Sequence, residues 1–205
     1  MSAANSLQVN EAMAAVADSR QGTTYGYKLD TNRLGLWLFL VSDSFLFGGL
    51  YVTRWYLLGG HRPDLNQMLG LIVTSVLLVS SFFMNRAETS IAHGDRRGML
   101  INTAITLLLG VAFLVGVVGV EWRTAPFGPA DGAQGSVFYM LTGMHAFHVF
   151  SGVLFLLVIL RNGARGLYSA DKHWAVEACA NYWHFVDVVW IFYYPALYLI
   201  GTVVK

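Results

Sequence analysis

Charged residues divide this sequence into five long stretches of the length that a membrane-spanning helix needs. Charged borders enclose residues 33–54, 64–86, 97–121, 131–161 and 177–205, and only Asp43 and Asp187 interrupt these stretches. A spanning helix requires about 20 mostly apolar residues, and an open sheet cannot satisfy its backbone hydrogen bonds in lipid. The sequence therefore predicts an all-α integral membrane bundle of five transmembrane helices, at roughly 34–57, 67–91, 98–121, 136–160 and 175–203.

Composition excludes several classes of function. Only 12% of the residues are charged and 56% are hydrophobic, whereas a soluble domain carries about 25% charged residues. The net charge of +1 gives no footprint for nucleic acid. Cys179 is the single cysteine, so neither an internal disulfide nor a Cys/His zinc spacing exists. No nucleophile elbow, phosphate loop or pair of broken transporter helices is found either.

The N-terminal segment differs from the rest of the chain. Residues 1–32 are small and polar, without the cationic start and apolar core of a cleaved signal peptide. We expect a loosely ordered polar tail there, with a short surface helix over LQVNEAMAAVADSR as the alternative, and a membrane domain over 33–205. Nine lysines and arginines fall on the tail side of the membrane and four on the other. The positive-inside rule then places the N-terminus in the cytoplasm and, after five spans, the C-terminus in the periplasm.

Several polar side chains fall inside these apolar stretches. Each charged group at the centre of a spanning helix costs about 2.5–3.5 kcal/mol on insertion scales, and such groups survive by pairing or by lining water. At 100° per residue, four polar residues of the last span share one stripe, which is therefore predicted to face the bundle: Glu177, Asn181, His184 and Asp187. The candidate buried polar residues are Asp43, Glu121, His145, His148, Glu177, His184 and Asp187.

Two interpretations apply to the three buried histidines His145, His148 and His184. The favoured one is hydrogen bonding between helices, helped by glycines that let helices approach closely. The alternative is haem or metal ligation, because neutral imidazole is a common metal ligand. Haem held between helices would need histidines at matched depth on two helices, and a carboxylate-bridged dimetal site would need repeated Glu-x-x-His motifs, which are absent.

Asp43 lies near the middle of the first span without a basic residue on its own helix face. Either another helix supplies a partner, or the carboxyl is protonated because an apolar surrounding disfavours its charge. The functional interpretations are a proton relay and a contact to a lipid head group.

Residue strings along most of the chain resemble one known family. YWHFVDVVWIF (182–192), preceded by KHWAVEA (172–178), closely resembles the last helix of subunit III of haem–copper oxidases, as in cytochrome c oxidase. GSVFYMLTGMHAFHVFSGVLFL (135–156) resembles the family's penultimate helix, and EWRTAPFGPADG (121–132) its preceding outer loop. GDRRGM (94–99) resembles a family turn and LIVTSVLLVSSFF (71–83) the helix before it. These strings follow the family's order over about residues 33–203.

The resemblance implies a five-helix form of a subunit that has seven helices in full-length members. Such a subunit binds no haem or copper, which sit in partner subunits I and II, and is itself non-catalytic. It flanks subunit I of a proton-pumping oxidase that reduces O2 to water in aerobic respiration, holds phospholipids and supports proton uptake. We expect a bacterial cytoplasmic membrane, subunits I and II as partners, and subunit IV or a respiratory supercomplex as further ones. Asp43 matches the family's reactive mid-membrane carboxylate, and Arg96 and Arg97 are candidate lipid head-group contacts.

Three departures from the family pattern leave alternatives open. The mid-membrane acid is usually Glu in cytochrome c oxidases, whereas Asp43 is a feature of quinol oxidases. Glu88 and Thr89 replace two adjacent histidines, and the first two helices are absent. A quinol oxidase or nitric oxide reductase partner is the first alternative. A haem-binding membrane cytochrome and a transporter are two others, from different classes of protein.

Overall fold

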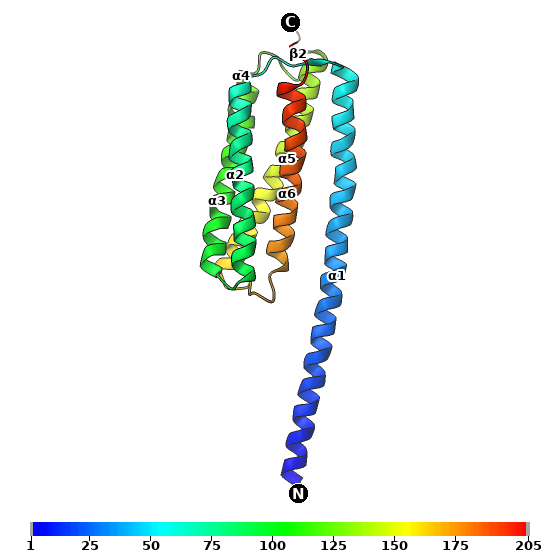
Figure 1. Ribbon diagram of the computed structural model, residues 1–205, viewed down its shortest axis with the longest axis vertical. Helices are drawn as coiled ribbons and strands as arrows, with labels where there is room; N and C mark the ends of the chain where they lie inside the picture. The colour runs from blue at the N-terminus through cyan, green and yellow to red at the C-terminus, as the bar shows by residue number, and fades with distance from the viewer. Residues whose placement is uncertain (1, 204–205) are drawn as a thin grey trace. The chain divides into compact units, whose positions relative to one another are not determined.

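The computed structural model describes the backbone of residues 2–203 and the side chains of residues 26–203. Five long helical segments dominate it, so the predicted all-α fold is confirmed (Figure 1). These segments contain helices α1 (Ser2–Leu58), α2 (Gln67–Ala92), α3 (Arg96–Leu114), α5 (Gly132–Ala164) and α6 (Trp174–Tyr194). Two-residue strands β1 (His61–Arg62) and β2 (Thr202–Val203) pair in parallel, His61 with Thr202 and Arg62 with Val203.

Four helices are long and apolar enough to cross a membrane. They are Gly26–Leu58, Gln67–Ala92, Arg96–Thr124 and Gly132–Ala164. The fifth predicted span corresponds to α6, which has 21 residues. Within the described residues α6 is not among the helices that meet the mean-hydropathy criterion, because His184, Asp187 and its tyrosines and tryptophans lower that value. Four of the five predicted spans thus meet these criteria of length and composition.

The N-terminal segment is helical, so the expectation of a loosely ordered tail is wrong. The backbone of α1 is continuous from Ser2 to Leu58. The segment before residue 33 contains no proline and many good helix formers, such as alanine, leucine and glutamate. No break in secondary structure marks the predicted division between residues 1–32 and 33–205. That division stays a prediction.

Helices α2, α3, α5 and α6 form a bundle in which α6 contacts α2 and α5, and α3 contacts α2 and α5. Large aromatic side chains of α6 fill its centre. Trp183 and Trp190 are almost fully buried, and their indole N–H groups donate to Ser80 Oγ at 3.0 Å and Thr74 Oγ1 at 2.9 Å on α2. Trp183 lies directly over Gly110 of α3.

The predicted role of the glycines is confirmed for three positions. A Cβ on Gly110 or Gly152 would lie within 3 Å of the Trp183 ring, and one on Gly116 would lie 2.5 Å from Val73. Gly119 is different, because its nearest neighbour is Val115 of its own helical segment, at 3.5 Å. The bundle therefore uses small residues where an aromatic or branched side chain of a neighbouring helix approaches closely.

Two helical segments change to π-helical hydrogen bonding at the end of the bundle that carries the C-terminus. Helix α3 continues as η1 (Val115–Glu121) and the short α4 (Trp122–Thr124), and α6 continues as η2 (Pro195–Leu199). A kink at Pro195 is expected from the sequence; the structure has the start of η2 there. Proline lacks the N–H that the α-helical pattern requires, which accounts for the change at this residue.

Candidate functional site: a buried polar seam

Asp43 of α1 and His148 of α5 form a buried pair. Asp43 Oδ2 lies 3.2 Å from His148 Nε2, and each side chain is only 10% exposed. The other ring nitrogen, Nδ1, donates to the Met144 carbonyl of the same helix at 2.8 Å. Of the two explanations offered for Asp43, a partner supplied by another helix is therefore the one found.

The contacts of His148 assign a proton to one of its ring nitrogens. A carbonyl oxygen only accepts hydrogen bonds, so Nδ1 carries a proton. The approach of Nε2 to Oδ2 lacks the geometry of a hydrogen bond, and Oδ2 has no hydrogen-bond partner among the described residues. The pair is therefore a close contact between two polar side chains of different helices.

The surroundings of His148 are partly aromatic and partly hydroxylic. The Phe47 ring meets the imidazole edge to face, with 4.6 Å between ring centroids. On its backbone side, the His148 carbonyl accepts from Ser151 Oγ at 2.8 Å and from Tyr182 Oη at 3.2 Å, and these two hydroxyls are 2.6 Å apart. Tyr182 belongs to α6, so three helices meet at this point.

His184 and Asp187 lie one turn apart on α6 and face α2. Ser81 Oγ lies 2.7 Å from His184 Nδ1, which confirms the hydrogen bond between helices predicted for this histidine. Asp187 is 3% exposed and its carboxyl interacts with the same Ser81 hydroxyl. Neither oxygen of Asp187 makes a hydrogen bond of full geometry within residues 26–203.

His145 is enclosed by aromatic rings instead of hydrogen-bond partners. It is fully buried, stacked on Trp190 with 4.6 Å between centroids, and Phe113 meets it edge to face at 5.6 Å. Neither ring nitrogen has a hydrogen-bond partner among the described residues. The hydrogen bond between helices predicted for His145 is therefore wrong. The neutral ring packs as an aromatic side chain.

The remaining acidic candidates lie near the two ends of the bundle. Glu121 closes η1, is 2% exposed and accepts a hydrogen bond from the Tyr198 hydroxyl of η2. Glu177 lies in the first turn of α6, at the opposite end, where it interacts electrostatically with Glu88 of α2. The seven candidates thus do not form one cluster. They are distributed along the interior of the bundle, from one end to the other.

The two candidate head-group arginines differ from each other. Arg96 donates from Nε to the Gly163 carbonyl at 2.8 Å and from Nη2 to the Ala164 carbonyl, so its guanidinium caps the C-terminus of α5. Arg97 is exposed. A lipid phosphate would therefore compete with backbone carbonyls at Arg96.

The sequence pattern did not predict that Arg54 is buried. This residue was counted among the four cations on the far side of the membrane. Arg54 is completely buried and donates four hydrogen bonds of 2.8–2.9 Å to the carbonyls of Gly59, His61, Ala196 and Ile200. These acceptors lie beyond the end of α1 and along and after η2. The available signal was its position, because a cation inside the predicted span 34–57 must find acceptors within the protein.

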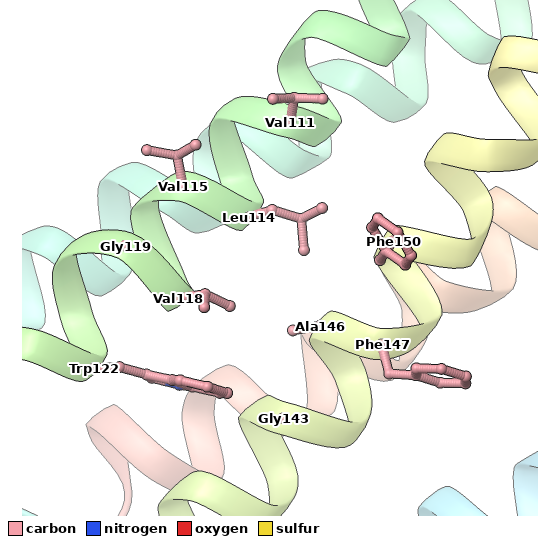
Figure 2. A pocket seen from close by; sticks show the side chains of 10 residues that line it. All are labelled: Val111, Leu114, Val115, Val118, Gly119, Trp122, Gly143, Ala146, Phe147 and Phe150. Carbon is pink, nitrogen blue, oxygen red and sulfur yellow. The ribbon is translucent and has the colours of Figure 1, made fainter.

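One apolar pocket lies apart from this polar seam. A pocket of about 490 Å³ opens between α3–η1 and α5 (Figure 2). Its walls are apolar, and the Trp122 indole lies across one end of it with Leu114, Phe147 and Phe150 further along. None of the seven candidate polar residues lines it. Among the residues searched, no group of three His, Cys, Asp or Glu side chains could hold a metal ion.

These features define a class of protein: an integral membrane helix bundle whose polar side chains are buried between its helices. The family model for cytochrome c oxidase subunit III matches residues 17–202. Cytochrome c oxidase subunit 3 of Thermostichus vulcanus is 38% identical over 178 residues, covering 83% of this chain and 88% of the relative. The grey seal (Halichoerus grypus) protein of the same name is 38% identical over 183 residues, covering 83% and 70%.

The chain belongs to the cytochrome c oxidase subunit III family. The Atlantic cod (Gadus morhua) relative is 34% identical over 200 residues and covers 89% of this chain. The resemblance noted from the residue strings is thereby confirmed. The relatives belong to an oxidoreductase complex of the respiratory chain, and the chain itself is an integral membrane protein.

Proposed function

We propose that this chain is the non-redox subunit III of a proton-pumping haem–copper oxidase. In that role it stabilises catalytic subunit I, while haem and copper are bound by subunits I and II. The observation that carries the proposal is the Asp43–His148 pair. Asp43 Oδ2 lies 3.2 Å from His148 Nε2, and His148 Nδ1 donates to a backbone carbonyl of its own helix. Such a pair holds two helices against each other, which favours a supporting role.

The proposed membrane topology adds α6 as a fifth span. Helix α6 packs between α2 and α5, and its polar side chains are directed at those helices, so its remaining surface is compatible with lipid. Five spans with the N-terminus in the cytoplasm would put the C-terminus in the periplasm. We place the protein in a bacterial cytoplasmic membrane, with subunits I and II as direct partners and subunit IV or a supercomplex as further ones.

Lipid seating is the second part of the proposal. Exposed arginines gather around the two turns at the end opposite the C-terminus: Arg86, Arg97, Arg161 and Arg165. On the proposed topology this end faces the cytoplasm, where each such cation near an anionic leaflet is worth about 1 kcal/mol of attraction. Phospholipids held there would keep the complex assembled and support proton uptake at the cytoplasmic surface of subunit I.

Removing this chain from the purified complex tests the role. The haem spectrum should remain unchanged, while oxygen consumption should start at a normal rate and then decay during turnover. Adding the subunit back before turnover should prevent the decay. A depleted complex with full and stable turnover would show that the supporting role is wrong, and an altered haem spectrum would point to direct participation in the redox sites.

The electron donor is proposed to be cytochrome c, because the relatives carry that name. A quinol oxidase or nitric oxide reductase partner would keep this fold and change the donor. The copper-binding Cys/His set in the adjoining subunit II decides between them, since a cytochrome c oxidase has it. A Soret band from the isolated chain, or substrate uptake into vesicles by the chain alone, would instead support a membrane cytochrome or a transporter.

A further inference from the structure

Glu121 is a buried acid with an unsatisfied oxygen. It lies at the end of η1, is 2% exposed, and receives the Tyr198 hydroxyl on Oε1. Its Oε2 has no hydrogen-bond partner among the described residues. Buried polar atoms without partners are rare in folded proteins, so an atom of this kind calls for a ligand.

Protonation of Glu121 would still leave its carboxyl group short of a hydrogen-bond partner. An ionised carboxylate has about four lone-pair sites, of which Tyr198 uses one. If Oε2 instead carried a proton, that hydroxyl would need an acceptor, and the described residues provide none. In either form, we expect a molecule outside the chain to supply the missing hydrogen-bond partner of Oε2.

A pocket of about 290 Å³ adjoins this carboxyl. Its polar side chains are Glu121, Asn66 and Thr124, and its other walls are apolar: Leu65, Leu69, Val120, Ala125 and Pro126. Asn66 Oδ1 accepts from the Leu69 N–H at 3.1 Å and keeps a second lone pair. Thr124 Oγ1 donates to the carbonyls of Val120 and Glu121, so its own lone pairs are also available. The pocket therefore offers several acceptors around one negative charge.

The position of the pocket narrows the choice of ligand. One wall is the start of α2 at Gln67, and the other is the end of the candidate span at Thr124. Both are ends of membrane spans, where lipid head groups lie. An apolar-walled site at this depth suits an amphiphile better than a free ion, because its carbon atoms cover the apolar walls while its polar end meets the carboxyl.

We infer that this pocket binds the primary ammonium group of an amphiphile, the group that an ethanolamine phospholipid carries. The ammonium supplies a positive charge for Glu121 and three N–H donors for Oε2, Asn66 and Thr124. A choline head group has the same charge but no N–H, and a glycerol head group has no positive charge. The site lies apart from Asp43 and His148, and the inference rests on the proposed function for its place in the membrane and for the complex in which it is tested.

Lipid binding to the intact oxidase complex tests the inference. The complex is delipidated in mild detergent and titrated with ethanolamine, choline and glycerol phospholipids of identical acyl chains, and bound lipid is counted by native mass spectrometry. Glu121→Gln removes the charge but keeps an acceptor for Tyr198. We expect it to weaken ethanolamine lipid binding at one site by about tenfold or more, the value of a lost charged hydrogen bond, and to leave the other two lipids unaffected.

Two further variants keep the test independent of folding. Asp64→Asn removes an exposed acid at the same end of the bundle, outside the pocket walls, and should bind like the wild type. Ala125→Leu fills the pocket without changing its charge and should lose the site. Equal ethanolamine lipid binding by wild type and Glu121→Gln would overturn the inference. If free ethanolamine bound as tightly as the lipid, ammonium recognition would stand, and the assignment to a lipid would be overturned.

Discussion

Arg54 Nε lies 2.8 Å from the carbonyl oxygen of Ala196, although 142 residues separate them in the chain. The same guanidinium also binds the Ile200 carbonyl after η2 and two carbonyls just after α1. It thus joins the end of the first helix to the end of the last, in a position where no carboxylate partner is found within residues 26–203. Carbonyls at helix C-termini carry partial negative charge, which compensates the buried cation.

Replacing Arg54 with lysine should destabilise this junction. A lysine has three donors on a single nitrogen, so at least one of the four carbonyls would lose its hydrogen bond, at about 1–3 kcal/mol for each buried group left unpaired. The thermal midpoint of the solubilised complex should fall, and protease should cut the residue 59–66 segment faster. Arg123→Lys is the matched control, because that arginine is exposed. Equal loss in both variants would contradict a specific role for Arg54.

Adding a methyl group to Gly110 should disturb the bundle core. The new Cβ would lie 2.5 Å from the Trp183 ring, which is held in place by its hydrogen bond to Ser80. Overpacking of this kind costs about 1–3 kcal/mol. We expect Gly110→Ala to lower the thermal midpoint and the yield of assembled complex, whereas Gly119→Ala should change neither, since its nearest neighbour lies 3.5 Å away. The reverse ranking would show that Trp183 can move aside easily.

The sequence predicts where the helices lie in the chain better than it predicts which side chains contact each other. Hydropathy and charge spacing predict the helices and, apart from the start of α1, most of their borders within a few residues, because burial in lipid constrains every residue of a span. Helical periodicity also predicts that His184 faces inward. Periodicity shows on which face of a helix a side chain lies, but it does not identify the residue that the side chain contacts. It therefore cannot predict that His184 contacts Ser81 or that Asp43 contacts His148.

Two errors have a common physical origin. His145 was expected to form a hydrogen bond with a neighbouring helix, and Arg54 was only counted among the four cations on the far side of the membrane. In the first case aromatic rings surround the imidazole, and in the second backbone carbonyls replace water as acceptors. Both environments are built by residues distant in the chain, including Trp190 and Ile200. The two π-helical segments were missed as well, since their hydrogen-bond pattern depends on how the ends of the helices pack.

A double-mutant cycle on His184 and Ser81 should measure the contact between α6 and α2. Their side chains are 2.7 Å apart, and hydrogen bonds between membrane helices average about 0.6 kcal/mol, with a maximum near 1.7. We expect His184→Ala and Ser81→Ala each to loosen the complex, and the double variant to lose less than the sum. The optical spectrum should stay unchanged in all three. Strict additivity would mean that the contact contributes nothing, and a lost haem band with normal assembly would mean that His184 is a ligand.

Substitutions at Asp43 and His148 should distinguish two models of their contact. In one the carboxyl donates a proton to the imidazole, and in the other a carboxylate faces an imidazolium. The hypothesis under test is a carboxyl proton donated to His148 Nε2, an arrangement in which neither side chain is charged. Asp43→Asn keeps a donor for Nε2 and should be mild. Asp43→Ala leaves the imidazole unpaired and should cost about 1–3 kcal/mol, and His148→Leu should cost at least as much, because it leaves a carboxyl buried without a partner.

Infrared difference spectroscopy then identifies the protonated group. Subtracting the spectrum of Asp43→Asn from that of the wild type should reveal the carbonyl stretch of a protonated carboxyl, and a hydrophobic carbodiimide should label Asp43 near neutral pH, because these reagents attack the protonated acid. A carboxylate band together with resistance to labelling would show that the proton resides on the imidazole. In that case Asp43→Asn would also be as damaging as Asp43→Ala, since an amide cannot replace the charge that an imidazolium requires.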